Sequence, residues 1–343
     1  MDLLKTLSEL PGAPGREERV RDFIIEQVKD HVDDMQVDAM GNLICKVKGS
    51  ADEPKRIMVA SHMDEIAFIV SRIDSKGFLR VNKLGGFDTR NLFARRVRIQ
   101  TRKHGDVFGV FNPAGRPIHV ASPEERNKIP QVKDFFVDVG MTHEQASETF
   151  RPGDPVTLVQ DFMQMGDYAT GKCMDNRVAC WLGVRLLQEV SAPVDDLYVV
   201  FTVQEEIGVR GAITSAYAVE PHVAIALDVT LAVDTPGVSE DDHITQLGQG
   251  AAIKIMDSGT VSSHELVEAF VELAESNEIN FQYEVLPLGG TDAAGMQRAR
   301  AGAKVITLSV PTRYVHTVTE MIAVQDMRDT LSLLKLYVSG AHA

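Results

Sequence analysis

Short apolar runs alternate with amphipathic helical segments along most of this chain, and that alternation limits the folds it can adopt. The run 57–60 is apolar at every position, as expected of a central strand covered on both faces. Further strands are predicted at 42–47, 66–73, 196–203, 223–227, 281–285 and 305–309, and helices at 17–30, 176–190, 262–276, 292–298 and 324–337. Strands that alternate with helices predict an α/β sheet.

The pattern changes between residues 74 and 166. Short alternating or β-branched stretches separated by Gly, Pro and Asn are typical of a small all-β unit. They lie at 78–81, 97–101, 107–111, 135–139 and 155–158. We therefore predict one α/β domain, made of residues 1–73 and 167–343, interrupted by a β-rich domain over residues 74–166. The segment 112–131 is polar and contains proline, and we expect a mobile loop there.

The composition narrows the function classes. With 343 residues, of which 44% are hydrophobic, the chain can bury a sizeable core. Its net charge of −14 argues against nucleic acid and anionic membranes as partners, because both attract basic surfaces. No stretch reaches the roughly 18 apolar residues of a membrane span, and the N-terminus lacks the features of a signal peptide. We expect a cytoplasmic protein.

Ionisable residues gather where the predicted strands end. His62 and Asp64 follow the strand that contains the run 57–60. Glu205 and Glu206 directly end the strand at 196–203, and Asp228 follows the strand at 223–227. Ligands of open α/β sheets bind at the carboxyl ends of the strands, so we expect these side chains to meet.

Two further candidates lie beyond the insertion. Asp175 stands at the start of a predicted helix, and His316 comes after the strand at 305–309. Taken alone, Asp175 is explained as a helix N-cap, and a single histidine as a surface or packed residue. Two adjacent carboxylates at the end of a buried strand, however, need a partner, because an unpaired buried charge is very costly. Metal ions would supply that partner.

The candidate ligands are two histidines and three carboxylates, namely His62, Asp175, Glu206, Asp228 and His316. This mixed nitrogen and oxygen set suits Zn²⁺, Co²⁺ or Mn²⁺ rather than a thiolate site. Two ions about 3.5–4 Å apart can share a bridging carboxylate and a bridging water. A carboxylate that binds no metal must then take the proton of that water and pass it to the leaving amine. One of the two adjacent glutamates can do this while the other binds metal.

Six stretches make the sequence distinctive. They are HMDEIAFIV at 62–70, MDNR at 174–177, QEEIGVRGA at 204–212, ALDVT at 226–230, GGTDAA at 289–294 and RYVH at 313–316. In this order, over nearly the whole chain, they resemble the M42 family of aminopeptidases, the TET and glutamyl aminopeptidase group. The resemblance implies a zinc-exopeptidase-like core, in which helices flank a central mixed sheet, and a small β-barrel-like insertion that serves dimerisation. It also implies peptide substrates and a homo-oligomer, typically a dodecamer built from dimers.

The same resemblance implies how the metal ligands divide. His62 and Asp228 look like the ligands of one ion, and Glu206 and His316 like those of the other. Asp175 looks like the bridging carboxylate.

Two other residues receive roles from the resemblance. Glu205 looks like the general base that activates the metal-bridging water, and Asp64 like the group that orients His62 through its second ring nitrogen. The chain departs from the family after His316, where Thr-Val-Thr-Glu replaces the more frequent Ser-Pro and then Glu. A second departure is Asn176, where many relatives have a second aspartate.

Other hydrolases compete with an aminopeptidase. A metal-dependent deacylase shares the same chemistry at the carbonyl group, and some relatives have carried a cellulase label. A glycosidase needs two carboxylates at a set separation and no metal ligands, so His62 and His316 count against a glycan hydrolase. The sequence leaves open the preferred N-terminal residue, the native metal, and whether Arg313 and Tyr314 contact substrate.

Overall fold

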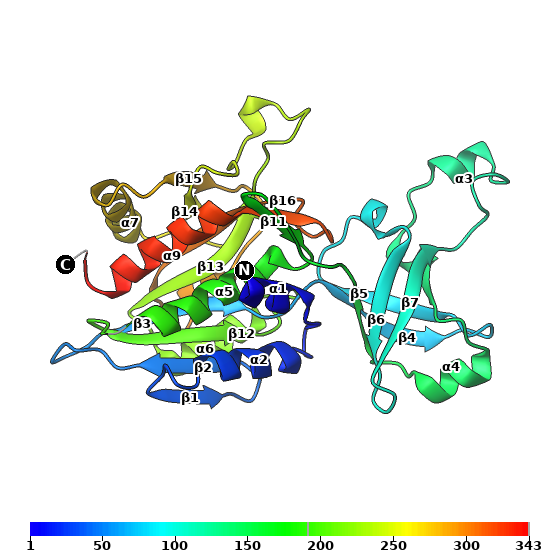
Figure 1. The fold of residues 1–343 in the computed structure, drawn as a ribbon, viewed down its shortest axis with the longest axis horizontal. Coiled ribbons are helices and arrows are strands. Elements are labelled where there is room, and N and C mark those ends of the chain that lie inside the picture. Colours follow the sequence, from blue (N-terminus) through cyan, green and yellow to red (C-terminus); the bar gives the residue numbers. More distant parts are fainter. Residues whose placement is uncertain (191, 342–343) are drawn as a thin grey trace.

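The computed structural model describes residues 1–190 and 192–341 and consists of a sheet with helices and a smaller barrel beside it (Figure 1). In these residues the large sheet has eleven strands. They are β1 (Asp34–Val37), β2 (Leu43–Val47), β3 (Arg56–His62), β10 (Met163–Met165), β11 (Tyr168–Gly171), β12 (Asp196–Thr202), β13 (Val223–Leu231), β14 (Ala251–Met256), β15 (Phe281–Val285), β16 (Lys304–Arg313) and β17 (Glu320–Ala323). The order is β1-β2-β12-β3-β13-β16-β17-β11-β10, and β14 pairs with both β16 and β15.

The centre of the sheet is parallel and its borders are antiparallel. Strands β12, β3, β13 and β16 run in one direction, whereas β2, β14 and β17 pair with them in the opposite direction. The predicted mixed α/β sheet is therefore confirmed. The register places Thr202 beside His62 and Asp228 beside Ser309, so the carboxyl ends of the parallel strands meet at one edge.

Helices cover both faces of the sheet. One face carries α1 (Asp2–Glu9), α2 (Glu18–Val28), α5 (Met174–Glu189), α7 (His264–Ser276) and α9 (Val324–Val338). The other face carries α6 (Arg210–Val219) and α8 (Asp292–Gln297).

Strand β3 shows why both faces need cover. Ile57 and Val59 pack in the cluster beneath the first helix layer, whereas Met58 and Ala60 pack against α6 and α8. Successive side chains of a strand point to opposite faces, so a run that is apolar at every position needs helices on both sides. None of these four side chains is more than 4% exposed.

The insertion closes into a separate barrel, in the order β4-β5-β8-β7-β6-β9. Its strands are β4 (Ala67–Ile73), β5 (Leu79–Leu84), β6 (Arg95–Gln100), β7 (Asp106–Pro113), β8 (Phe135–Asp138) and β9 (Pro155–Leu158), and α4 (His143–Thr149) packs beside them. The barrel has its own core, in which the Phe111 ring lies against Phe68 and Phe135.

The barrel begins before the predicted boundary at residue 74. Strand β4 lies in the stretch assigned to the α/β domain, yet among the described strands it pairs with β5 and β9 of the barrel and with none of the large sheet. Strand β10, at 163–165, lies before the second boundary but belongs to the large sheet. Both strands are short and apolar or alternating, so nothing local in the sequence tells which sheet each of them joins.

The segment 112–131 contains more order than a loop. It includes α3 (Pro123–Asn127), which lies at the tip of an arm that projects from the barrel (Figure 1). Ser122 and Glu125 form a capping box, in which each side chain accepts a backbone N–H of the other residue. The arm exposes Ile118, Val120 and Ile129, each more than half accessible to solvent.

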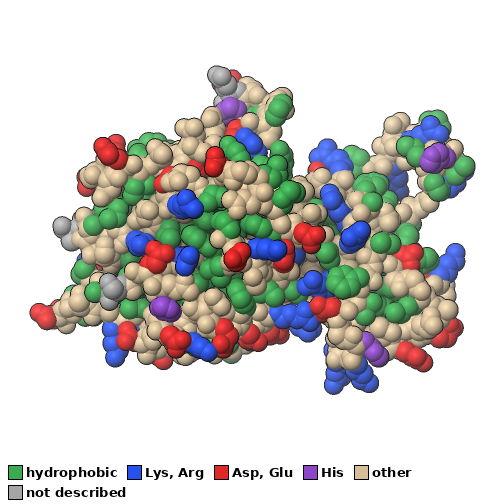
Figure 2. All heavy atoms as spheres, in the orientation of Figure 1, with side chains coloured by type: hydrophobic (Ala, Val, Ile, Leu, Met, Phe, Trp, Pro, Cys, Tyr) green, Lys and Arg blue, Asp and Glu red, His purple; other side chains and the backbone are tan. Residues whose placement is uncertain are grey.

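The surface of the molecule carries charged side chains of both signs. Acidic and basic side chains are interspersed over the face shown in Figure 2. Among the described residues, no helix is both long enough and apolar enough to cross a membrane.

Candidate metal centre

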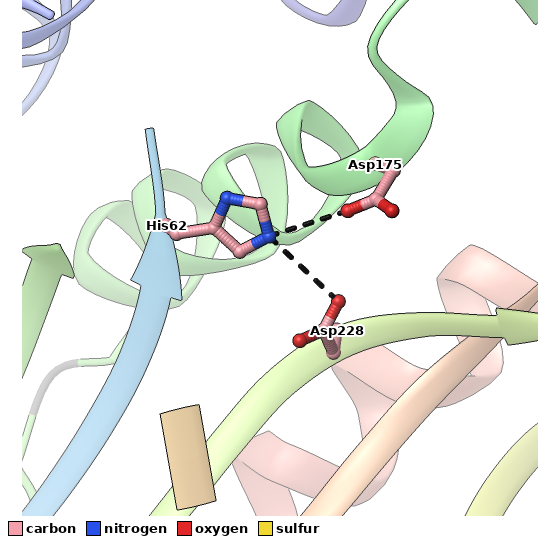
Figure 3. A group of neighbouring side chains, drawn as sticks. All are labelled: His62, Asp175 and Asp228. Atoms are coloured by element: carbon pink, nitrogen blue, oxygen red, sulfur yellow. Dashed lines mark ion pairs between the residues drawn. The ribbon is translucent and has the colours of Figure 1, made fainter. Parts of the chain in front are cut away.

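Two of the predicted carboxylate ligands lie near the imidazole nitrogen of a third predicted ligand, His62. Nε2 of His62, the last residue of β3, lies 3.2 Å from Oδ1 of Asp175 and 4.0 Å from Oδ1 of Asp228. Figure 3 shows the two carboxylates approaching this nitrogen from the start of α5 and from β13. Asp228 lies inside β13 rather than after its end, because the strand continues to Leu231.

A second trio forms around the other histidine. Nε2 of His316 lies 3.4 Å from Oδ2 of Asp175 and 3.4 Å from Oε2 of Glu206. Asp175 therefore belongs to both groups, with Oδ1 facing His62 and Oδ2 facing His316. In each trio the potential ligand atoms lie within 4.8 Å of one another.

Asp64 contacts both the ring of His62 and the segment that carries Glu205 and Glu206. Nδ1 of His62 lies 3.2 Å from the main-chain oxygen of Asp64 and 3.5 Å from its Oδ1. The same carboxylate accepts the backbone N–H groups of Glu205 and Glu206, at 2.9 and 3.1 Å. Asp64 is fully buried, so a single side chain fixes the ring of His62 and the turn that follows β12.

Glu205 lies beside the first trio. Its Oε2 is 3.9 Å from Nε2 of His62. Burial, followed by the like charges of Asp228 and Asp292, raises the pKa of Glu205 well above its usual value, although His62 opposes this. A carboxyl group with a raised pKa holds a proton more readily than an ordinary glutamate does.

Glu320, which the sequence reading did not single out, supports both ligand segments. Its Oε1 accepts the backbone N–H of His316 at 2.7 Å, and its Oε2 accepts that of Asp175 at 3.0 Å. The side chain is 2% exposed. The sequence shows only a glutamate four residues after His316, and that spacing does not reveal the contact with Asp175.

The two trios and Glu205 bring together four carboxylates but only two histidines among the described residues. Burial would raise the pKa of Asp175, but hydrogen bonds from His316 and His62 lower it. Burial raises the pKa of Asp228 and of Glu206, and in both cases the charge of Asp175 adds to the rise. Carboxylates that are hard to ionise together need a nearby cation.

The pKa values of both histidines are raised as well, because carboxylates lie next to each ring. Burial lowers the pKa of His316, but the carboxylates of Asp175 and Glu206 raise it to about 11 overall. Hydrogen bonds to Asp175 and Asp64 likewise raise the pKa of His62 well above its usual value, against the effect of burial. Each imidazole is thus surrounded by anionic oxygens.

These residues fit a pair of divalent ions. Oε1 of Glu206 is buried and has no hydrogen-bond partner among the described residues, as expected of an oxygen that awaits a cation. Histidine nitrogens and carboxylate oxygens are ordinary ligands of Zn²⁺, Co²⁺ and Mn²⁺.

A cavity of about 500 Å³ opens onto the two trios. Gly86, in the segment that follows barrel strand β5, lies at its wall, and a Cβ atom there would lie 3.3 Å from Nδ1 of His316. The adjacent Gly85 has φ +97°, and a Cβ atom there would meet Ile66. The barrel therefore approaches the site with backbone where side chains would not fit.

A larger depression, of about 930 Å³, lies at the opposite ends of the parallel strands. Arg56 and Arg300 line it, but both pair with Glu220. None of the predicted site residues lines it, whereas the smaller cavity is lined by members of both trios.

The chain is similar to known proteins in sequence and in fold. A match to the M42 glutamyl aminopeptidase family covers residues 41–333. The chain is 33% identical to the lysyl aminopeptidase of Pyrococcus furiosus over 97% of its own length and 95% of that protein. The structure of aminopeptidase APDkam598 from Desulfurococcus kamchatkensis is similar with a TM-score of 0.93 at 36% identity, over 99% of this chain and 94% of the other. The TET1 peptidase of Pyrococcus horikoshii, which can assemble into a tetrahedron or a large octahedral shell, is similar with a TM-score of 0.87 at 30% identity, over 99% of each chain.

Proposed function

Because this chain belongs to the M42 glutamyl aminopeptidase family, we propose that it removes N-terminal residues from peptides with the help of two divalent metal ions. The observation that carries the proposal is the position of Asp175, whose two oxygens face two different histidines. A carboxylate placed in this way suits a bridge between two cations.

The ligand roles follow from the two trios. His62 and Asp228 would hold one ion, and Glu206 and His316 the other, with Asp175 shared between them. Zn²⁺ and Co²⁺ suit this donor set, and Mn²⁺ is compatible with it. When bound, such ions polarise the scissile carbonyl group and make water a stronger nucleophile.

Glu205 would act on the proton. Its carboxylate would take a proton from the attacking water as the C–O bond forms, and would pass it to the nitrogen of the leaving amine as the C–N bond breaks in the step that follows. Its Oε2 lies 3.9 Å from Nε2 of His62, so the carboxylate lies beside the residues that would hold the first ion. Asp64 would keep the ring of His62 in place through its Nδ1 side.

The first experiment measures release of p-nitroanilide from aminoacyl substrates by protein stripped of metal and then supplied with Co²⁺ or Zn²⁺. We expect turnover that depends on metal and on a free substrate amine, so N-acetylated versions of the same substrates serve as controls. Failure to cleave any free aminoacyl substrate with two ions bound per chain would contradict the proposal. Equal cleavage of the acetylated controls would point to a different amidase.

The partners we propose are peptides and other copies of the chain. The similarity to TET1, which forms shells, supports self-assembly, and we propose a dodecamer built from dimers that pair through the barrel domain. We further propose a cytoplasmic location.

A further inference from the structure

Six apolar side chains from several segments line the cavity beyond the metal ligands and Glu205, together with three glycines, two threonines and Lys254. The six apolar residues are Val209, Val229, Leu231, Leu286, Leu288 and Val315. Gly289 and Gly290 complete the wall on the side that carries the two leucines 286 and 288. Anything bound beside the two trios therefore lies mainly against aliphatic groups.

Lys254 is the one further ionisable side chain among the described residues that line the cavity, and its ammonium group is already paired with two carboxylates. Its Nζ lies 2.9 Å from Oε1 of Glu284 and 3.4 Å from Oδ2 of Asp257. The Lys254 side chain is 1% exposed, and those of Glu284 and Asp257 are fully buried. Thr230 also donates a hydrogen bond to Oε1 of Glu284. The ammonium group is thus part of the wall rather than a free binding group.

Arg313 is likewise committed to another residue. Its Nε and Nη2 atoms lie 2.5 and 2.7 Å from the two carboxylate oxygens of Asp234, a bidentate pair that does not line the cavity. The neighbouring Tyr314 is also absent from the described lining. Neither residue offers a charge to a bound side chain.

This inference rests on the proposed function. We infer that the cavity selects peptides whose N-terminal side chain is uncharged and apolar, such as leucine or methionine. An aliphatic side chain gains from leaving water against this wall. A glutamate side chain would lose hydration without meeting a free cation, and a lysine side chain would meet no carboxylate other than the metal ligands and Glu205.

The test compares kcat/KM for leucyl, methionyl, glutamyl and lysyl p-nitroanilides with metal-loaded protein. We expect the two apolar substrates to exceed the two charged ones by at least about tenfold, the scale on which apolar pockets discriminate. Glutamyl or lysyl p-nitroanilide as the best substrate would overturn the inference and leave the peptidase function standing. Absence of turnover on these four and on every other aminoacyl p-nitroanilide would overturn both.

A charge placed on the wall should change the selection. Leu288 lines the cavity and is 76% exposed, so the chain tolerates substitution there. We expect Leu288→Arg to raise the ratio of glutamyl to leucyl kcat/KM about tenfold, and Leu288→Glu to raise the lysyl to leucyl ratio similarly. Val261→Arg is the matched control, because Val261 is 66% exposed but does not line the cavity. Ratios that move no more than in this control would overturn the inference.

Discussion

At the scale of single residues, Asp175 connects the two halves of the site. It stands at the start of α5, where its backbone is not yet helical, and Glu320 holds its N–H. The sequence alone also allowed an ordinary N-cap; in the structure both Asp175 and Asn176 have non-helical backbone angles, and the carboxylate of Asp175 lies near His62 and His316. The side chain of Asp175 is therefore free to face both histidines.

Replacing Asp175 by alanine tests the bridge. We expect Asp175→Ala to weaken the binding of both metal ions by more than about 100-fold, since loss of a mere supporting group already costs 10–100-fold. Equilibrium dialysis with Co²⁺ or Zn²⁺ measures both affinities. Asp30→Ala, an exposed change on the surface, serves as control. A variant that retains two tightly bound ions would refute the bridging role.

Glu205 and Glu206 are adjacent in sequence, yet they are predicted to differ in function. We expect Glu205→Gln to keep both metal ions and to lose about 10²–10⁴-fold in kcat, because the amide cannot accept the proton of water. Metal content and turnover are measured on the same sample, with Glu272→Gln on the exposed side of α7 as control. Loss of metal in Glu205→Gln would show that the two glutamates exchange roles.

At the scale of elements, a buried charge cluster joins the segment after β3 to the start of α5. Glu65 accepts hydrogen bonds from Nζ of Lys172 at 2.6 and 2.8 Å and lies 3.7 Å from Nη2 of Arg177. Arg177 in turn donates to the backbone oxygens of Met63 and Leu7. The cluster thus fixes α5, which carries Asp175, against the segment that carries His62. Burial would raise the pKa of Glu65, but Lys172 and Arg177 lower it overall.

Removing the charge of Glu65 should destabilise this junction. We expect Glu65→Gln to lower the free energy of unfolding of the metal-free protein by about 3–5 kcal/mol, because Lys172 and Arg177 would remain buried without a counter-charge. Urea unfolding followed by circular dichroism measures the change. Glu189→Gln is the control, since it breaks the exposed pair with Lys335 and should cost at most about 1 kcal/mol. Equal midpoints for the two variants would show that the cluster contributes little.

At the scale of the whole molecule, the barrel and its arm stand apart from the sheet (Figure 1). Val318, from the segment between β16 and β17, packs into the barrel core, but the exposed residues of the arm belong to neither core, so a change on the arm need not disturb the site. The exposed Ile118, Val120 and Ile129 give the arm an apolar surface of the kind that marks contact with another protein.

We expect the double variant Ile118→Glu and Ile129→Glu to shift the protein to smaller assemblies than the native chain forms, because buried carboxylates would oppose pairing. Size-exclusion chromatography with light scattering measures the mass. Val37→Glu is the control, because Val37 is 46% exposed on β1, in the other body of the molecule. An unchanged mass for the double variant would place the subunit contact elsewhere.

The sequence by itself determined the layers and the chemistry of the site. Apolar periodicity is local, so it revealed the strand that contains 57–60, the helices on either side and the β-rich insertion. It did not reveal β14, whose apolar run is interrupted by Lys254, or α6, which is rich in alanine, serine and threonine. The donor types were also readable, because histidine and carboxylate side chains carry the same chemistry in any fold.

Only the tertiary structure decided which oxygen faces which histidine. Sheet register brings Asp228 close to His62, although the sequence placed Asp228 after its strand rather than inside it. Glu320 and Lys254 acquire their partners only when distant segments meet, the one with Asp175 and the other with Glu284. These contacts depend on distances of a few ångströms across the fold, and residue spacing along the chain contains no such information.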